Sequence, residues 1–89
     1  MAPSRADVRE WLRVLAAGEV TREEAASRAR PWIDEREREV TDAALWTPLS
    51  RLASADLETG PCDYLYGVWD FEEWLAEFEL LVDFDERSS

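Results

Sequence analysis

The sequence predicts a small all-α protein, an antiparallel bundle of three to four helices. Three observations lead to this prediction: apolar residues recur at helical spacing, helix-capping patterns precede those stretches, and no sustained run alternates between apolar and polar residues. The chain has 89 residues, 46% of them hydrophobic, which suffices for one core and leaves no room for a second. We therefore expect a single helical domain over residues 1–89, with a frayed tail over about residues 84–89.

The first helix is expected to begin after Ser4. The Ser4 side chain can cap the helix, and Asp7, three residues later, completes a capping-box pattern. Gly18 supplies the expected stop. The apolar positions have the spacing of one helix face, and they are Val8, Trp11, Leu12 and Leu15. This pattern predicts an amphipathic helix that buries one face.

The second helix is expected to begin at the capping box Thr21–Glu24. Its expected core-facing side chains are Ala25, Ala29, Trp32 and Ile33. Pro31 lacks a backbone donor, so the sequence leaves two alternatives: a kink near residues 29–31, or a break followed by a new start. The mixed-charge run Asp34–Glu39 is interpreted as the exposed end of this helix.

The third helix has a cap signal at Thr41–Asp42 and a proline that makes its start ambiguous. It either runs from Asp42 with a local distortion, or Thr47 caps a helix that has Pro48 at its first position. We favour one bent helix, because the apolar positions fit a single stripe. Those positions are Leu45, Leu49 and Leu52, with Ala53 on the same side.

The stretch 56–67 has no periodicity and is expected to be a loop, with a turn at Thr59–Pro61. It contains both tyrosines, one of which we expect to cover the open end of the bundle together with Leu65, while the other stays exposed. Cys62 is expected to be a small, partly buried loop residue.

The last helix is predicted over Asp70–Val82, with Asp70 as its cap and Glu73 completing the capping box. Its apolar side is expected to be Phe71, Trp74, Leu75, Phe78 and Val82. The opposite side consists of Glu72, Glu73, Ala76, Glu77 and Glu79. Leu80 falls in the middle of this acidic side, where it is either a small apolar anchor or an ordinary exposed leucine.

The charge is divided unevenly along the chain. Residues 1–51 contain ten acidic residues and nine arginines, whereas residues 52–89 contain eleven acidic residues and one arginine. A strongly acidic surface built by residues 52–89 would favour basic protein partners, although acidic residues can also serve only to keep a protein soluble. Glu73 and Glu77 repel each other four residues apart, and no cation stands at the complementary helix positions. We therefore interpret the acidic side as a docking surface.

Composition excludes several kinds of chemistry. The chain has no histidine and one cysteine, so it can form neither a Cys/His zinc site nor an internal disulfide. We expect no catalytic residues, no cofactor and no metal, and therefore no enzyme. No apolar stretch is long enough to cross a membrane, and the first residues do not form a signal peptide. We expect a cytoplasmic protein.

Spaced aromatic and aliphatic residues along the chain resemble the bacterial colicin-like self-protective immunity family, in particular the colicin D immunity type. The residues that carry this resemblance are Trp32, Val40–Asp42, Leu45–Trp46, Leu49, Leu52, Ala55–Leu57, Tyr64–Tyr66 and Asp70–Leu75. The resemblance spans about residues 8–81. It implies a compact helical bundle that binds a cognate toxin nuclease, of the tRNA-cleaving kind, and blocks its basic active-site cleft by mimicking nucleic acid.

The expected function is therefore that of a small acidic immunity protein that inhibits a toxin nuclease. The alternative is a non-enzymatic structural or adaptor module that binds a basic protein or associates with itself. We expect no direct contact with nucleic acid or membrane, and a monomer. The partner-binding candidates are acidic side chains and apolar or aromatic anchors: Asp56, Glu58, Asp63, Tyr64, Tyr66, Glu72, Glu73, Glu77, Glu79 and Leu80.

Overall fold

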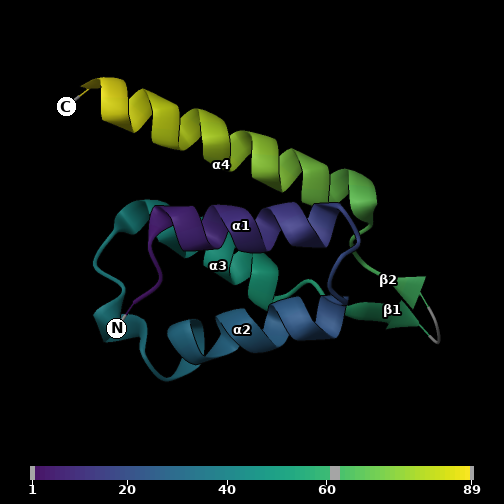
Figure 1. Cartoon of the computed structure of the whole chain (residues 1–89). Coiled ribbons are helices and arrows are strands. Elements are labelled where there is room, and N and C mark those ends of the chain that lie inside the picture. The colour runs from purple at the N-terminus through teal and green to yellow at the C-terminus, as the bar shows by residue number, and fades with distance from the viewer. Residues whose placement is uncertain (1, 61–62, 89) are drawn as a thin grey trace.

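The fold is a bundle of four helices, seen in a computed structural model that describes residues 2–60 and 63–88 (Figure 1). The helices are α1 (Arg5–Ala16), α2 (Arg22–Asp34), α3 (Trp46–Ala53) and α4 (Val68–Ser88). Two 3₁₀ turns, η1 (Glu37–Glu39) and η2 (Ala43–Leu45), connect α2 to α3. The predicted small all-α bundle is confirmed. The burial expected for Cys62, and the end of the turn expected at Thr59–Pro61, fall outside the described residues.

A short antiparallel hairpin connects α3 to α4, and the sequence did not predict it. Its strands are β1 (Glu58–Gly60) and β2 (Asp63–Tyr64), with Glu58 opposite Tyr64 and Gly60 opposite Asp63. Strands of three and two residues are too short to show an alternating pattern. The hairpin projects from the end of the bundle where α4 begins (Figure 1).

Successive helices run in opposite directions, so the bundle is antiparallel throughout (Figure 1). The closest packing is between α2 and α3 and between α1 and α4. In Figure 1, α2 and α4 lie on opposite sides of the molecule, with α1 and α3 between them. All four helices contribute to one core, which includes Val8, Leu12, Leu15, Ala25, Ala29, Leu49, Leu52, Phe71, Trp74 and Phe78.

Both ends of α1 follow the sequence prediction. Ser4 accepts a hydrogen bond from the Asp7 backbone N–H at 3.1 Å, and the Asp7 carboxylate accepts one from the Ser4 N–H at 2.9 Å. Gly18 adopts a φ of 76°, a left-handed conformation that glycine reaches without strain. The N–H groups of Gly18 and Glu19 donate to carbonyl groups in the last turn of α1, at 3.1 and 2.8 Å. This is a Schellman motif, and it satisfies carbonyls that the helix end would leave free.

The two prolines have different outcomes. Thr21 caps α2 by accepting the Glu24 N–H at 3.0 Å, and α2 then continues through Pro31 to Asp34 without a break. The favoured single helix from Asp42 is confirmed in part: Asp42 caps η2, and α3 follows it directly at Trp46. The expected local distortion is the 3₁₀ turn, and no side chain caps α3 itself. Pro48 lies in the first turn of α3, where its missing N–H leaves no helix hydrogen bond unmade.

The last helix is longer than predicted. α4 begins at Val68, because Asp70 accepts the Gly67 N–H at 2.8 Å from inside the first turn rather than acting as the cap itself. It extends to Ser88, across the tail where we expected fraying. Phe71, Trp74 and Phe78 are buried as predicted. No helix in the described residues is long and apolar enough to cross a membrane.

Candidate functional site

Two of the four glutamates on the acidic side of α4 are paired with arginines from other helices. Arg9 of α1 pairs with Glu79 at 3.1 Å, and Arg51 of α3 pairs with Glu77. The interpretation that Glu73 and Glu77 lack a compensating cation is therefore wrong for Glu77, whereas Glu73 forms no ion pair among the described residues. The cations come from segments far away in the sequence, which the spacing within one helix cannot reveal.

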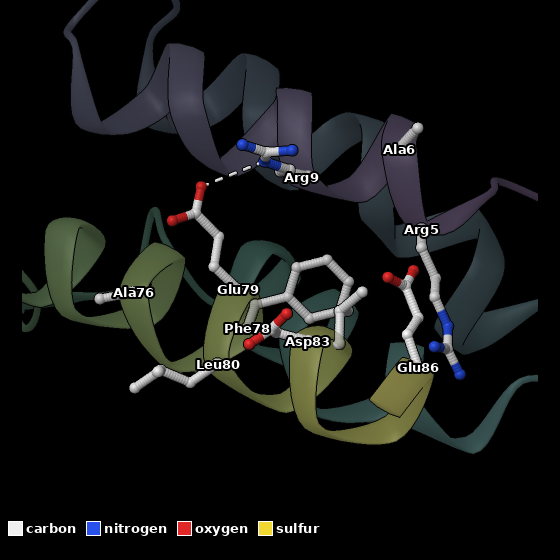
Figure 2. Close-up of a pocket in the computed structure, with 10 residues that line it drawn as sticks. Arg5, Ala6, Arg9, Ala76, Phe78, Glu79, Leu80, Asp83 and Glu86 are labelled. Atoms are coloured by element: carbon white, nitrogen blue, oxygen red, sulfur yellow. Dashed lines mark hydrogen bonds and ion pairs between the residues drawn. The ribbon is translucent and has the colours of Figure 1, made fainter. Parts of the chain in front are cut away.

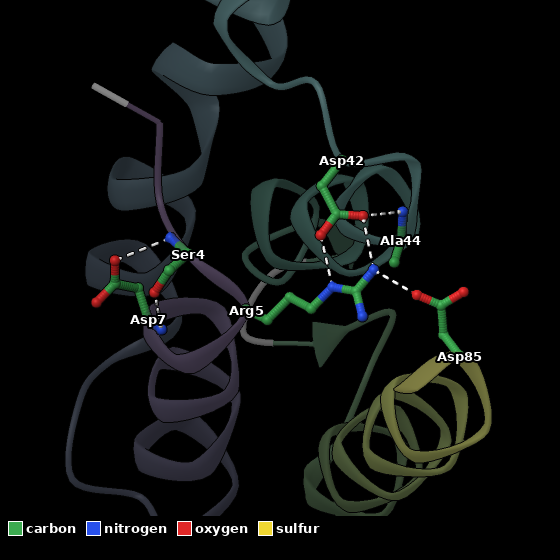
Figure 3. Close-up of polar contacts among 6 residues, drawn as sticks. All are labelled: Ser4, Arg5, Asp7, Asp42, Ala44 and Asp85. Carbon is green, nitrogen blue, oxygen red and sulfur yellow. Dashed lines mark hydrogen bonds and ion pairs between the residues drawn. The ribbon is translucent and has the colours of Figure 1, made fainter. Parts of the chain in front are cut away.

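Arg5 holds three segments together at the end of the bundle (Figure 3). Its Nε donates to Asp42 at 2.6 Å and its Nη2 donates to Asp42 at 3.1 Å and to Asp85 at 2.7 Å. The hydrogen bonds from Arg5 hold the pKa of the Asp42 carboxyl below its usual range, and those to Asp42 and Asp85 raise the pKa of Arg5. The start of α1, the cap of η2 and the last turns of α4 are thereby joined.

A groove of about 730 Å³ runs between α1 and the C-terminal half of α4 (Figure 2). Its lining contains two arginines of α1, three acidic residues of α4, and apolar side chains: Arg5, Ala6, Arg9, Ala76, Phe78, Glu79, Leu80, Val82, Asp83 and Glu86. In Figure 2 the Leu80 side chain points away from α1, at the outer edge of the groove. Arg9 is paired with Glu79 across this groove, while Arg5 and Asp83 are paired with residues outside its lining, so the groove offers a bound ion little unmatched charge.

The hairpin is held against α2 by its first tyrosine. The Tyr64 hydroxyl donates to Glu23 at 3.0 Å, and the Arg22 guanidinium lies 4.3 Å from the centre of the Tyr64 ring. The hydrogen bond to Glu23 raises the pKa of Tyr64, because ionisation would remove the donated proton. Arg22 also lies 5.1 Å from the Phe71 ring, so its flat guanidinium is placed between two aromatic side chains.

The two tyrosines behave as predicted, and Leu65 does not. Tyr66 packs on the core, with its ring 4.9 Å from Trp74 in an edge-to-face arrangement, while Tyr64 is exposed. Leu65 is 51% exposed instead of covering the bundle end. The prediction that one tyrosine covers the core and the other stays exposed is therefore confirmed.

The structure does not bring the ten predicted site residues onto one surface. Glu58, Asp63 and Tyr64 lie on the hairpin, whereas Glu72, Glu73 and Leu80 lie on exposed positions of α4. Tyr66 belongs to the core edge, and three acidic candidates are held in ion pairs with arginines: Asp56, Glu77 and Glu79. Among the described residues, Glu72 and Glu73 form no ion pair, so the unpaired acidity of the α4 candidates is limited to these two.

Three exposed arginines on the other side of the bundle have no carboxylate partner among the described residues, or only a long ion pair. Within residues 2–60 and 63–88, Arg28 and Arg38 form no ion pair or hydrogen bond, and both are exposed. Arg36 stacks at 5.4 Å from the Trp32 ring and has one long ion pair, at 3.8 Å to Glu39. We call Arg28, Arg36 and Arg38 the α2–η1 arginines: Arg28 lies in α2, Arg38 lies in η1, and Arg36 directly precedes η1.

Sequence reasoning missed the α2–η1 arginines as candidates. The signal was present, since four arginines fall within residues 28–38, but five acidic residues within 34–42 made the region look neutral. Only the tertiary pairing shows which of the arginines are free: Arg30 of the same helix is bound to Asp56 at 2.6 Å.

These features define a small, acidic protein with four helices in its described residues, ion pairs between its helices, and three exposed arginines on the α2–η1 side. A family model described as YxzC DNA-binding protein matches residues 2–78, and the chain therefore belongs to that family. No curated protein and no solved structure matches the chain.

The family match overturns the resemblance to the colicin-like immunity family. The predicted inhibition of a toxin nuclease, the role in bacteriocin immunity and the basic toxin partner are therefore wrong. The family match also contradicts the expected absence of direct contact with nucleic acid. The physical reason is that the resemblance rested on spaced aromatic and aliphatic residues. Any amphipathic helix bundle needs such residues for its core, and most of them are either buried here or packed against the core.

Proposed function

We propose that this chain binds double-stranded DNA, with the α2–η1 arginines contacting the phosphate backbone. The observation that carries this proposal is the match of a DNA-binding family model to residues 2–78. Guanidinium groups suit this role because they present several N–H donors to phosphate oxygens in a fixed plane. Arg28 and Arg38 have those donors available, since neither is bound to a carboxylate in the described part of the chain.

The distribution of charge favours one orientation on DNA. α4 contains eight acidic residues and one arginine, whereas residues 22–39 contain six acidic residues and five arginines. DNA repels the first region more strongly than the second. Because α2 and α4 lie on opposite sides of the bundle, the chain can approach DNA with α4 turned away (Figure 1).

The same charge limits the expected affinity. The net charge is −11, so the protein as a whole is repelled by DNA, and three arginines can contact only a few phosphates. The logarithm of the binding constant falls with the logarithm of salt concentration by about 0.9 for each phosphate neutralised. We therefore expect weak binding with a slope of about −2 to −3, much shallower than that of a strongly basic DNA-binding protein.

Fluorescence anisotropy of a labelled duplex, measured over a series of salt concentrations, tests the proposal. The double variant R28A/R38A should lose most of the binding and flatten the salt slope. The matched control R9A/R13A removes the same charge from α1, where Arg9 is paired with Glu79 and Arg13 with Glu10. Absence of binding by the wild-type chain at low salt contradicts the proposal, and so does an equal loss in the two double variants.

We take the chain to act by binding and not by catalysis, as expected from a sequence without histidine. We also place it in the cytoplasm with the DNA, which cell fractionation with an antibody to the chain can check.

A further inference from the structure

The outer side of α4 carries an unpartnered row of apolar side chains. Among the described residues, eight large hydrophobic side chains are exposed, and five of them belong to α4: Val68, Trp69, Leu80, Leu81 and Phe84. Leu80 and Phe84 are each 70% exposed, although an i, i+4 pair on one helix normally faces a core. They lie opposite the buried side formed by Phe71, Trp74 and Phe78. α4 therefore has an apolar stripe on both of its sides.

The outer stripe has a symmetric spacing. It consists of Glu73, Ala76, Leu80, Phe84 and Arg87, all exposed, and we call these five residues the outer stripe. The intervals between them are three, four, four and three residues, so the spacing reads the same in both directions from Leu80. Residues three and four apart lie on one helix face, and the five therefore form one continuous row.

The residue types match this symmetry as well. If two copies of α4 pack antiparallel about a two-fold axis at Leu80, the two leucines meet at the centre. Ala76 then faces Phe84 of the other copy, which places a small side chain against a large one. Glu73 faces Arg87 of the other copy, which places opposite charges together. A two-fold interface requires this kind of self-complementarity.

We propose that the outer stripe of α4 is a homodimer interface, in which two copies of the chain pack antiparallel about Leu80. Leu80, Phe84 and Arg87 lie beyond residue 78, where the family match ends, so the interface does not follow from that match. The proposal does not depend on DNA binding, and its test needs no DNA.

Charge repulsion between two acidic chains opposes the dimer but does not block it. Four acidic residues of α4 are already paired within one copy: Glu77 with Arg51, Glu79 with Arg9, Asp85 with Arg5, and Asp83 with Arg87 of the outer stripe itself. The remaining long-range repulsion is screened by salt. We therefore expect dimerisation to strengthen as salt concentration rises, the opposite of the dependence expected for DNA binding. An interface of one helix per copy is small, so the dimer should be weak and dependent on concentration.

Sedimentation equilibrium over a range of protein and salt concentrations measures the dimer directly. The wild-type chain should form a concentration-dependent dimer, and L80D should weaken it by at least about tenfold, because a carboxylate at the axis would face its own symmetry mate. Leu80 is largely exposed in the monomer, so this change leaves the core intact, which circular dichroism verifies. L65D is the matched control, since Leu65 is also exposed but lies on the hairpin connection.

A charge exchange tests the antiparallel register. E73R and R87E should each weaken the homodimer, because each brings like charges together across the axis. An equimolar mixture of the two variants should restore association as a heterodimer, since opposite charges then face each other at both ends. A wild-type chain that stays monomeric at all concentrations overturns the proposal, because the outer stripe is then not a contact between two copies of this chain. A mixture that fails to restore association overturns the register.

Discussion

The α4 side and the α2–η1 side of this bundle use charged residues in different ways. α4 has the larger number of charges, yet its Glu77, Glu79 and Asp85 are bound by arginines from other elements. The α2–η1 side looks neutral in composition, yet it exposes Arg28 and Arg38 without partners among the described residues. Net charge therefore does not show which charged side chains are available to a partner. Their availability depends on the ion pairs formed within the fold.

The largest expected difference in the free energy of unfolding is between substitutions on the two sides of α4. F71A removes a side chain that is 2% exposed and lies 5.2 Å from the Trp74 ring. It should lower the free energy of unfolding by about 3–5 kcal/mol, which is enough to unfold much of a small domain. F84A should change it by no more than about 0.5 kcal/mol. Urea unfolding followed by circular dichroism, at protein concentrations low enough to keep the chain monomeric, measures both. Similar losses for the two variants would mean that the outer stripe is part of the core.

A smaller loss in the free energy of unfolding, dependent on pH, is expected when the contact that joins α4 to α1 and η2 is removed. D42A removes the bonds from Arg5 and the cap on Ala44, and should cost about 1–2 kcal/mol at neutral pH. Because folding lowers the pKa of Asp42, its contribution is present above the usual aspartate pKa of about 3.9 and is lost as pH falls below it. The difference in unfolding free energy between wild type and D42A should therefore narrow in acid. A difference that stays constant with pH would show that the carboxylate charge does not matter.

The smallest expected change in the free energy of unfolding distinguishes an acidic residue of α4 that has an ion pair from one that has none. E77Q breaks the ion pair with Arg51 and should lower the free energy of unfolding by about 0.2–1 kcal/mol. E72Q removes an acidic side chain that has no ion pair among the described residues, so it should have no effect or stabilise the helix slightly. Urea unfolding at low salt compares the two variants. Equal effects would contradict the assignment of Glu77 to a stabilising contact.

Local features of the fold could be predicted from the sequence. The caps at Ser4 and Thr21 and the stop at Gly18 depend on residues within one turn, and the structure contains all three. The buried side of α4 follows from a 3.6-residue period, which is also local. The 3₁₀ form of η2, the turn that leads into α3, was not predicted because apolar spacing alone cannot distinguish a 3₁₀ turn from the first turn of an α-helix.

The candidate site could not be predicted in the same way. Whether Glu77 is a docking residue or a structural one depends on Arg51, which lies 26 residues away in the chain. Whether Arg28 is available while Arg30 is not depends on the position of Asp56 after α3. Such pairings require the tertiary arrangement. The family resemblance failed for a related reason, since the residues behind it describe a core and not a binding surface.

The most direct test of the contrast between the two sides is a nuclear magnetic resonance titration of the isotope-labelled chain with a short DNA duplex at low salt. Our account predicts that the backbone signals of residues 28–38 shift on addition of DNA, while those of residues 72–87 on α4 change little. Shifts confined to α4, or no shifts anywhere in the chain, would contradict it.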